Sequence, residues 1–160
     1  MPPAVPTVGS VAGPVQDASP SPAFLKVFNP MVRFALRSRL APLLRGFALA
    51  SFHGRRTGRS YEVVVTWHEL DGRVYVVTPA PWRANFAGGA PMTMRHLGVD
   101  VPGRGVLETD PEVVADVVAR LLAAGEPPRA FALKMPADHR MTAADVVATN
   151  RAIVSFHPAP

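Results

Sequence analysis

The chain of 160 residues contains no cysteine, which excludes disulfides, thiolate metal sites and cysteine nucleophiles. No run of about 18 apolar residues occurs, so no transmembrane helix is expected. The first six residues lack the basic and apolar blocks of a secretory signal. P-loop, Rossmann and Gly-x-Ser-x-Gly patterns are also missing, so the chemistries they serve have no sequence support. These absences favour a cytoplasmic protein.

Acidic residues are missing from a long stretch near the start. Residues 23–60 hold eight Lys and Arg side chains and no Asp or Glu, whereas the net charge of the whole chain is only +5. Such asymmetry indicates an anionic partner: a phosphorylated cofactor, an anionic membrane surface or nucleic acid. The basic residues do not alternate with aromatic ones as in single-strand-binding barrels, so nucleic acid is not expected.

A metal site is not expected either. The histidines are scattered, and no two of them lie at the spacing that would aim two imidazoles at one ion. They are His53, His68, His96, His139 and His157.

The composition, with 48% hydrophobic residues, allows one sizeable core, and we expect a single domain over residues 23–160. Residues 1–22 contain six prolines and one charged residue, Asp17. A segment of this kind buries too little apolar surface to offset the entropy lost on ordering. It is therefore predicted to be a disordered leader.

Helix start signals occur at three places. Asn29-Pro30 predicts a helix from residue 30 to about 38, followed by one more turn over 40–45. This segment either packs on the core or lies as a basic amphipathic helix on anionic lipid, and packing is favoured because the helix is short and has no tryptophan. Asp110-Pro111 predicts a helix over 111–124, and Thr142 caps another that runs to residue 150.

Strand patterns alternate with turn signals over the rest of the chain. Asp71-Gly72 between two β-rich runs predicts a tight hairpin. The predicted strands span residues 47–52, 61–70 and 73–78 as a three-stranded meander, 92–97 and 105–108 around a loop at Pro102-Gly103, and 152–156. Residues 131–135 are predicted to form a short strand or an irregular turn, and residues 82–86 a helical turn. This pattern predicts a closed or partly closed antiparallel barrel.

Two glycines frame a basic loop, His53-Gly54-Arg55-Arg56-Thr57-Gly58-Arg59-Ser60, between two of these strands. Glycines permit positive φ angles, which can turn backbone N–H groups toward one point, and the arginines add charge. The loop is therefore a candidate anion site. The alternative is a solvated hairpin loop whose arginines keep a sheet edge soluble.

This loop, the Asp71-Gly72 hairpin, Trp82-x-x-Asn85 and the turn Gly89-Ala90-Pro91-Met92 together resemble the deazaflavin-dependent nitroreductase family. The similarity runs from about residue 28 to residue 122. The resemblance implies an α+β fold: a six- to seven-stranded antiparallel split β-barrel, FMN-binding-like, with an N-terminal helix. It also implies a monomer or a homodimer.

The same resemblance implies a coenzyme site. Arg55, Arg56, Thr57, Gly58 and Arg59 would lie near the phosphate of a deazaflavin coenzyme of the F-420 type, or of FMN or FAD. Trp82 and Asn85 would border the coenzyme pocket. The implied reaction is hydride transfer from the reduced coenzyme to a quinone, a nitro compound or another conjugated acceptor, with the reactivity supplied by the coenzyme. No catalytic residue is identified.

Two other classes of function stay open. One is a non-catalytic barrel that binds a flavin or another small molecule. The other is a basic module associated with a membrane or with nucleic acid, for which residues 23–46 offer a peripheral contact with the inner membrane face.

Overall fold

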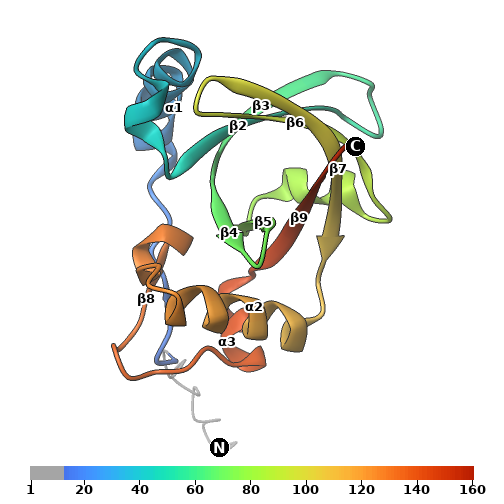
Figure 1. Ribbon diagram of the computed structural model, residues 1–160. Coiled ribbons are helices and arrows are strands. Elements are labelled where there is room, and N and C mark those ends of the chain that lie inside the picture. Colours follow the sequence, from blue (N-terminus) through green and yellow to red (C-terminus); the bar gives the residue numbers. More distant parts are fainter. Residues whose placement is uncertain (1–12) are drawn as a thin grey trace, which may run out of the picture.

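A curled antiparallel sheet of seven strands forms the centre of the fold (Figure 1). The computed structural model describes residues 13–160. The strand order is β3-β2-β6-β7-β9-β5-β4, and every pair is antiparallel. The strands are β2 (Phe47–His53), β3 (Ser60–Thr66), β4 (His68–Leu70), β5 (Arg73–Thr78), β6 (Ala90–His96), β7 (Val99–Glu108) and β9 (Ala152–Pro158). The sheet curls into a half-barrel, which confirms the predicted α+β split barrel.

Helices cover the barrel at two places. The α-helices are α1 (Pro22–Arg37), α2 (Pro111–Ala123) and α3 (Ala143–Thr149), and the short 3-10 helices are η1 (Ala41–Leu44), η2 (Pro81–Phe86) and η3 (Pro128–Phe131). A separate two-stranded ribbon joins β1 (Gln16–Asp17) to β8 (Leu133–Lys134). One core fills the barrel interior, and a second core lies between the barrel and α2.

The local signals at α2, at α3 and at the β4–β5 turn are confirmed. Asp110 caps α2 through the backbone N–H of Glu112. Thr142 and Asp145 form a capping box at α3. Burial raises the pKa of Asp145, but hydrogen bonds from His139 and Thr142 outweigh that effect and leave the pKa below its usual value.

The predicted three-stranded meander is wrong. β3 ends at Thr66, and β4 pairs with β5 at the other edge of the sheet, so β3 and β5 do not pair. The apolar run is interrupted at Trp67. Its ring stacks on the His96 ring with a centroid distance of 3.9 Å, and its backbone N–H donates to Gly46 O. His68 then turns inward and is buried. The two outer strands, β3 and β4, therefore follow one another directly in the chain, and the barrel is split between them.

The prediction of a loop at Pro102-Gly103 is also wrong, because both residues lie inside β7. The turn between β6 and β7 is Leu97-Gly98, with φ angles of 50° and 83°. The pairing of β9 with β7 begins only at Gly103. Pro102, which has no backbone N–H, therefore leaves no gap in the hydrogen bonds between these two strands.

Helix α1 begins eight residues earlier than the predicted start at Pro30. Ser21 caps it by accepting a hydrogen bond from Phe24 N at 3.2 Å. Pro30 lies inside the helix on an exposed side, where water can replace the lost backbone hydrogen bond. The other side of the helix buries Val32 and Leu36 against β2.

The prediction of a disordered leader fails for its described part, residues 13–22. Val15 is buried, and Gln16-Asp17 forms β1. The cause is a residue far away in the sequence, Arg151, whose side chain is fully buried and donates to Asp17 Oδ1 at 2.8 Å. Residues 1–12 of the predicted leader lie outside the described residues.

The Arg151 guanidinium also holds three backbone carbonyl groups. It donates to Thr149 O at 2.6 Å, Ala132 O at 2.8 Å and Phe131 O at 3.2 Å. These contacts tie β1, the segment from η3 to β8 and the end of α3 to one another.

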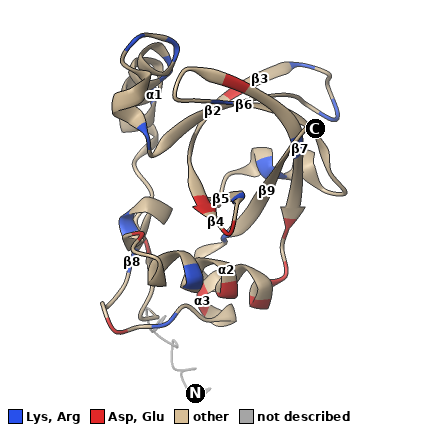
Figure 2. Ribbon diagram, in the orientation of Figure 1, with Lys and Arg blue, Asp and Glu red and all other residues tan. Residues whose placement is uncertain are grey.

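Charge is unevenly placed over this fold (Figure 2). α1 carries only basic charged side chains, and so does the loop between β2 and β3. α2 carries two acidic residues and one arginine. Within residues 13–160, no helix is both long and apolar enough to cross a bilayer.

We predict that Arg151→Met lowers the free energy of unfolding by about 3 kcal/mol, because several buried acceptors would lose their donor. Chemical denaturation in urea measures the change. Arg140→Met is the matched control: Arg140 is exposed, and its loss should change stability by less than about 0.5 kcal/mol. Equal stability of the two variants would contradict the role given to Arg151.

We predict that the stabilising effect of Asp17 depends on pH. Hydrogen bonds from Ser19 and Arg151 lower the pKa of Asp17 from 3.8 to about 2. A carboxyl group with a lowered pKa in the folded state stabilises the protein above its unfolded pKa, and this contribution is lost as the pH falls through the folded pKa. Asp17→Asn should therefore be less stable than wild type at neutral pH, and the gap should close between about pH 4 and pH 2. A gap that stays constant over this range would refute the assignment.

Candidate functional site

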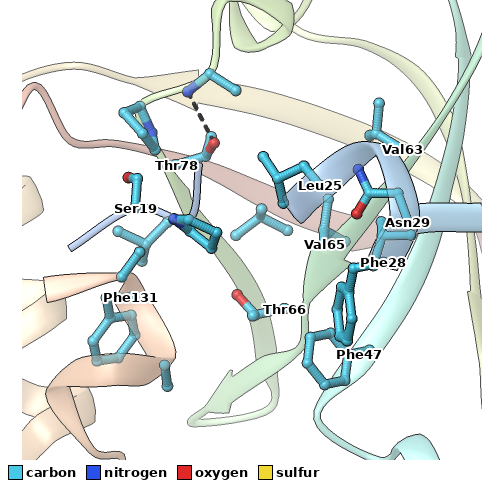
Figure 3. A pocket seen from close by; sticks show the side chains of 18 of the residues that line it. Ser19, Leu25, Phe28, Asn29, Phe47, Val63, Val65, Thr66, Thr78 and Phe131 are labelled. Atoms are coloured by element: carbon cyan, nitrogen blue, oxygen red, sulfur yellow. Dashed lines mark hydrogen bonds between the residues drawn. The ribbon is translucent and has the colours of Figure 1, made fainter. Parts of the chain in front are cut away.

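A groove of about 750 Å³ opens at the split of the barrel. Its lining strands are β3, one edge of the sheet, and β5, the strand next to the other edge. One side is formed by α1, and the facing side by η3 and the residues around it (Figure 3). The floor consists of valines from β3 and β5, which do not pair with each other, and Trp82 of η2 also lines the groove. The apolar lining residues include Phe24, Leu25, Phe28, Phe47, Val63, Val65, Val76, Val77 and Phe131.

The wall opposite α1 depends on Arg151. Ser19, Phe131 and Ala132 line the groove, and all three accept hydrogen bonds from the Arg151 guanidinium. The buried arginine therefore lies behind this wall and fixes the distance between its two chain segments.

The two threonines of the groove are already bonded within the protein. Thr78 Oγ1 accepts from Ala80 N at 3.0 Å, as Figure 3 shows. Thr66 Oγ1 lies 2.9 Å from His68 Nε2. Arg33 differs: its Nη2 donates to Glu62 O, but its Nε is buried and has no hydrogen-bond partner within the described residues. A buried charged donor without a partner favours a ligand that brings an acceptor.

Helix η2 positions the tryptophan of the groove. Arg83 donates to Thr78 O at 2.9 Å and to Asn150 O at 2.7 Å, which fastens η2 to β5 and to the end of α3. Burial, and to a lesser degree the charge of Arg151, lower the pKa of Arg83. The Trp82 ring packs against Phe52 and Phe86 with centroid distances of 5.7 and 5.9 Å.

The basic loop lies at the tip of the β2–β3 hairpin, as predicted, and outside the groove lining. Its amides are largely engaged within the protein. Gly54 N donates to Arg59 O and Gly58 N to Gly54 O, both at 2.8 Å, and Arg59 N donates to Thr57 Oγ1. An anion bound here would therefore rely on the guanidinium groups more than on backbone donors.

The glycines of the loop serve two different needs. Gly58 has a φ of 65°, a conformation that side chains disfavour. Gly54 has an ordinary φ but no room, because a Cβ there would lie 2.6 Å from the Tyr61 ring.

Asn85 joins the loop to η2. Its Oδ1 accepts from Arg55 N at 2.9 Å, and its Nδ2 donates to Trp82 O at 2.8 Å. The Arg55 side chain donates to Ala87 O in the same region. The structure thus brings Arg55, Asn85 and Trp82 together.

The remaining predicted residues lie at the surface. Arg56, Thr57 and Arg59 are exposed on the loop, and of all the predicted site residues only Trp82 lines the groove. His96 stacks on Trp67, and its Nε2 lies 2.8 Å from Arg45 O, outside the groove lining. Within residues 13–160, no three His, Asp or Glu side chains gather to hold a metal ion.

Sequence reasoning missed most of the groove. Arg33 lies in a predicted helix, but the direction of its side chain toward the groove depends on how α1 packs against the barrel. Residues 127–132 carry no pattern that links them to β3. Both depend on contacts between segments distant in the chain.

The fold and groove define a split-barrel protein with a ligand-sized apolar site. No family model and no curated protein matches the sequence. A solved structure titled as a domain-swapped dimer is similar with a TM-score of 0.50 and 12% identity, over 86% of this chain and 100% of that chain. Another, titled F420 reductase, has a TM-score of 0.42 and 13% identity, over 72% of this chain and 88% of that one. Likeness at this identity shows the fold alone, and the family resemblance rests on the sequence motifs.

We predict that Asn85→Ala frees the loop amide of Arg55. Losing a hydrogen bond of about 1 kcal/mol should speed exchange of that amide with solvent roughly 5- to 10-fold. Amide hydrogen exchange followed by NMR measures the effect, with Val65 in the body of the hairpin as the internal control. Unchanged exchange at Arg55 would show that Asn85 does not hold the loop.

Proposed function

We propose that this protein is a split-barrel oxidoreductase that holds a deazaflavin coenzyme of the F-420 type and passes hydride to a quinone, a nitro compound or another conjugated acceptor. The observation that carries the proposal is the groove, an apolar site lined by a buried charged donor, Arg33 Nε, that has no partner within residues 13–160. The coenzyme would supply the hydride chemistry, and the protein would bind it, orient it and exclude water.

The groove suits the ring system of such a coenzyme. Its volume of about 750 Å³ lies in the range of sites for drug-sized ligands. Trp82, Phe28 and Phe47 offer aromatic surfaces to a flat conjugated ring. Arg33 Nε would donate to a ring carbonyl or another acceptor, and Asn29 adds an amide at the same wall.

The basic loop suits an anionic tail. β3 leads from the groove at Val63 back to Ser60 beside the loop, and three residues of strand span about 10 Å. An elongated ligand with its ring in the groove could therefore place a phosphate near Arg56 and Arg59. Guanidinium groups bind phosphate oxygens by charge-assisted hydrogen bonds. Arg55, Thr57, Gly58 and Asn85 would shape this end of the site.

A second candidate is a barrel that binds a flat apolar molecule without catalysis. The occupied amides of the loop favour it, because they leave fewer donors for a phosphate. FMN or FAD in place of the deazaflavin is a variant of the first candidate.

We predict that the purified protein binds F-420 with micromolar affinity and that Ala130→Phe weakens binding at least 10-fold. Ala130 lines the groove, so an added ring would occupy the space needed by the coenzyme. Coenzyme fluorescence measures binding, and melting temperature checks the fold. Ala137→Phe, at an exposed position outside the groove lining, is the matched control and should bind as wild type.

The same titration with FMN and FAD separates the coenzymes, and oxidation of bound reduced F-420 by menadione tests catalysis. Binding without oxidation would favour the non-catalytic barrel. Wild-type affinity in Ala130→Phe would place the ligand outside the groove and overturn the proposal.

A further inference from the structure

The outer side of α1 is an apolar stripe that no described residue covers. Its four residues recur at three- and four-residue steps, so they share one side of the helix. They are Phe24, Val27, Met31 and Phe34, and the last is 73% exposed. The opposite side of α1 packs on the barrel. The helix therefore has two separate apolar sides and needs only one of them for folding.

The stripe continues onto two neighbouring turns. Leu40, which precedes η1, and Leu43 of η1 are exposed, and so are Leu97 and Val99 at the β6–β7 turn. This turn lies against η1, since a Cβ on Gly98 would be 3.9 Å from the Cβ of Ala41. Figure 1 shows both turns beside α1. We call these eight residues the α1 face.

The α1 face concentrates apolar surface at one end of the molecule. It holds eight of the eleven large apolar side chains that are exposed within residues 13–160. Exposed apolar surface gathered in this way marks an interaction site, whereas single exposed residues are ordinary. Something other than this part of the chain is therefore expected to cover it.

The unpaired charges around the α1 face are positive. Asp100, next to Val99, is paired with Arg95 at 3.0 Å. No Asp or Glu occurs between Asp17 and Glu62, and Glu62 is already paired with Arg37. Lys26, Arg39 and Arg45 form no ion pair with any residue of the described chain. Apolar helix faces flanked by Lys and Arg are typical of helices that lie in the interface of anionic bilayers.

We propose that the α1 face docks this protein on the surface of an anionic lipid bilayer. The apolar side chains would enter the interface, and Lys26, Arg39 and Arg45 would meet the phosphates of the headgroups. A second copy of the chain fits less well, because a two-fold contact would bring two sets of uncompensated positive charges together. Phe24 belongs both to the α1 face and to the groove wall, so docking would place the groove beside the membrane.

Vesicle co-sedimentation of the full chain tests this proposal. Vesicles of phosphatidylcholine mixed with phosphatidylglycerol should bind the protein, and phosphatidylcholine alone should bind it at least about 10-fold more weakly. Phe34→Ser should lower the partition coefficient roughly 10-fold, because one aromatic side chain no longer enters the interface. Val147→Ser is the matched control: Val147 is 68% exposed, but on α3, and its loss should leave binding unchanged.

Sedimentation equilibrium of the same proteins provides the second arm. A wild-type monomer that binds mixed vesicles supports the proposal. A dimer at micromolar concentration that Phe34→Ser dissociates would show that a second copy covers the α1 face, and would overturn it. Wild-type vesicle binding by Phe34→Ser, or no binding of the wild type to mixed vesicles, would overturn it as well.

Discussion

The buried guanidinium of Arg151 connects the parts of this structure that the strand pairings leave separate. It bonds Asp17, the carbonyl groups of Phe131 and Ala132, and the end of α3 at Thr149. A buried charge of this kind is tolerated only when nearly all of its donors find acceptors. Because those acceptors come from distant segments, satisfying one side chain fixes the N-terminal segment, η3 and α3 together. One wall of the groove is the result.

The groove exists because the sheet does not close. β3 and β4 are consecutive in the chain, yet they lie at opposite edges of the sheet, and the break at Trp67 separates them. α1 and η3 stand over the opening without filling it. The site is therefore set by packing on a split barrel. The buried Nε of Arg33, which has no partner among the described residues, is a product of the same arrangement.

What the sequence predicted correctly has local causes. Asp110, Thr142 and Asp71-Gly72 act on the residues next to them, and the structure confirms all three. The failures have non-local causes. Pro30 and Pro102 predict boundaries, but Pro30 lies on an exposed side of α1 and Pro102 lies in β7 beyond the end of its pairing with β9. The order of Gln16-Asp17 depends on Arg151, more than a hundred residues away. Of the candidate site, Trp82 of the predicted motif lies beside a ligand-sized space, whereas the opposite wall had no sequence signal.

The central claim is that the split of the barrel is where this protein binds its ligand. NMR spectra of the protein titrated with F-420 test it most directly, because each residue reports separately. The account predicts that chemical-shift changes gather on the methyl groups of Val63, Val65 and Val76 and on the Trp82 indole, with smaller changes at Arg56 and Arg59. Changes confined to the β2–β3 loop or to the outer side of α1, with the groove signals unmoved, would contradict it.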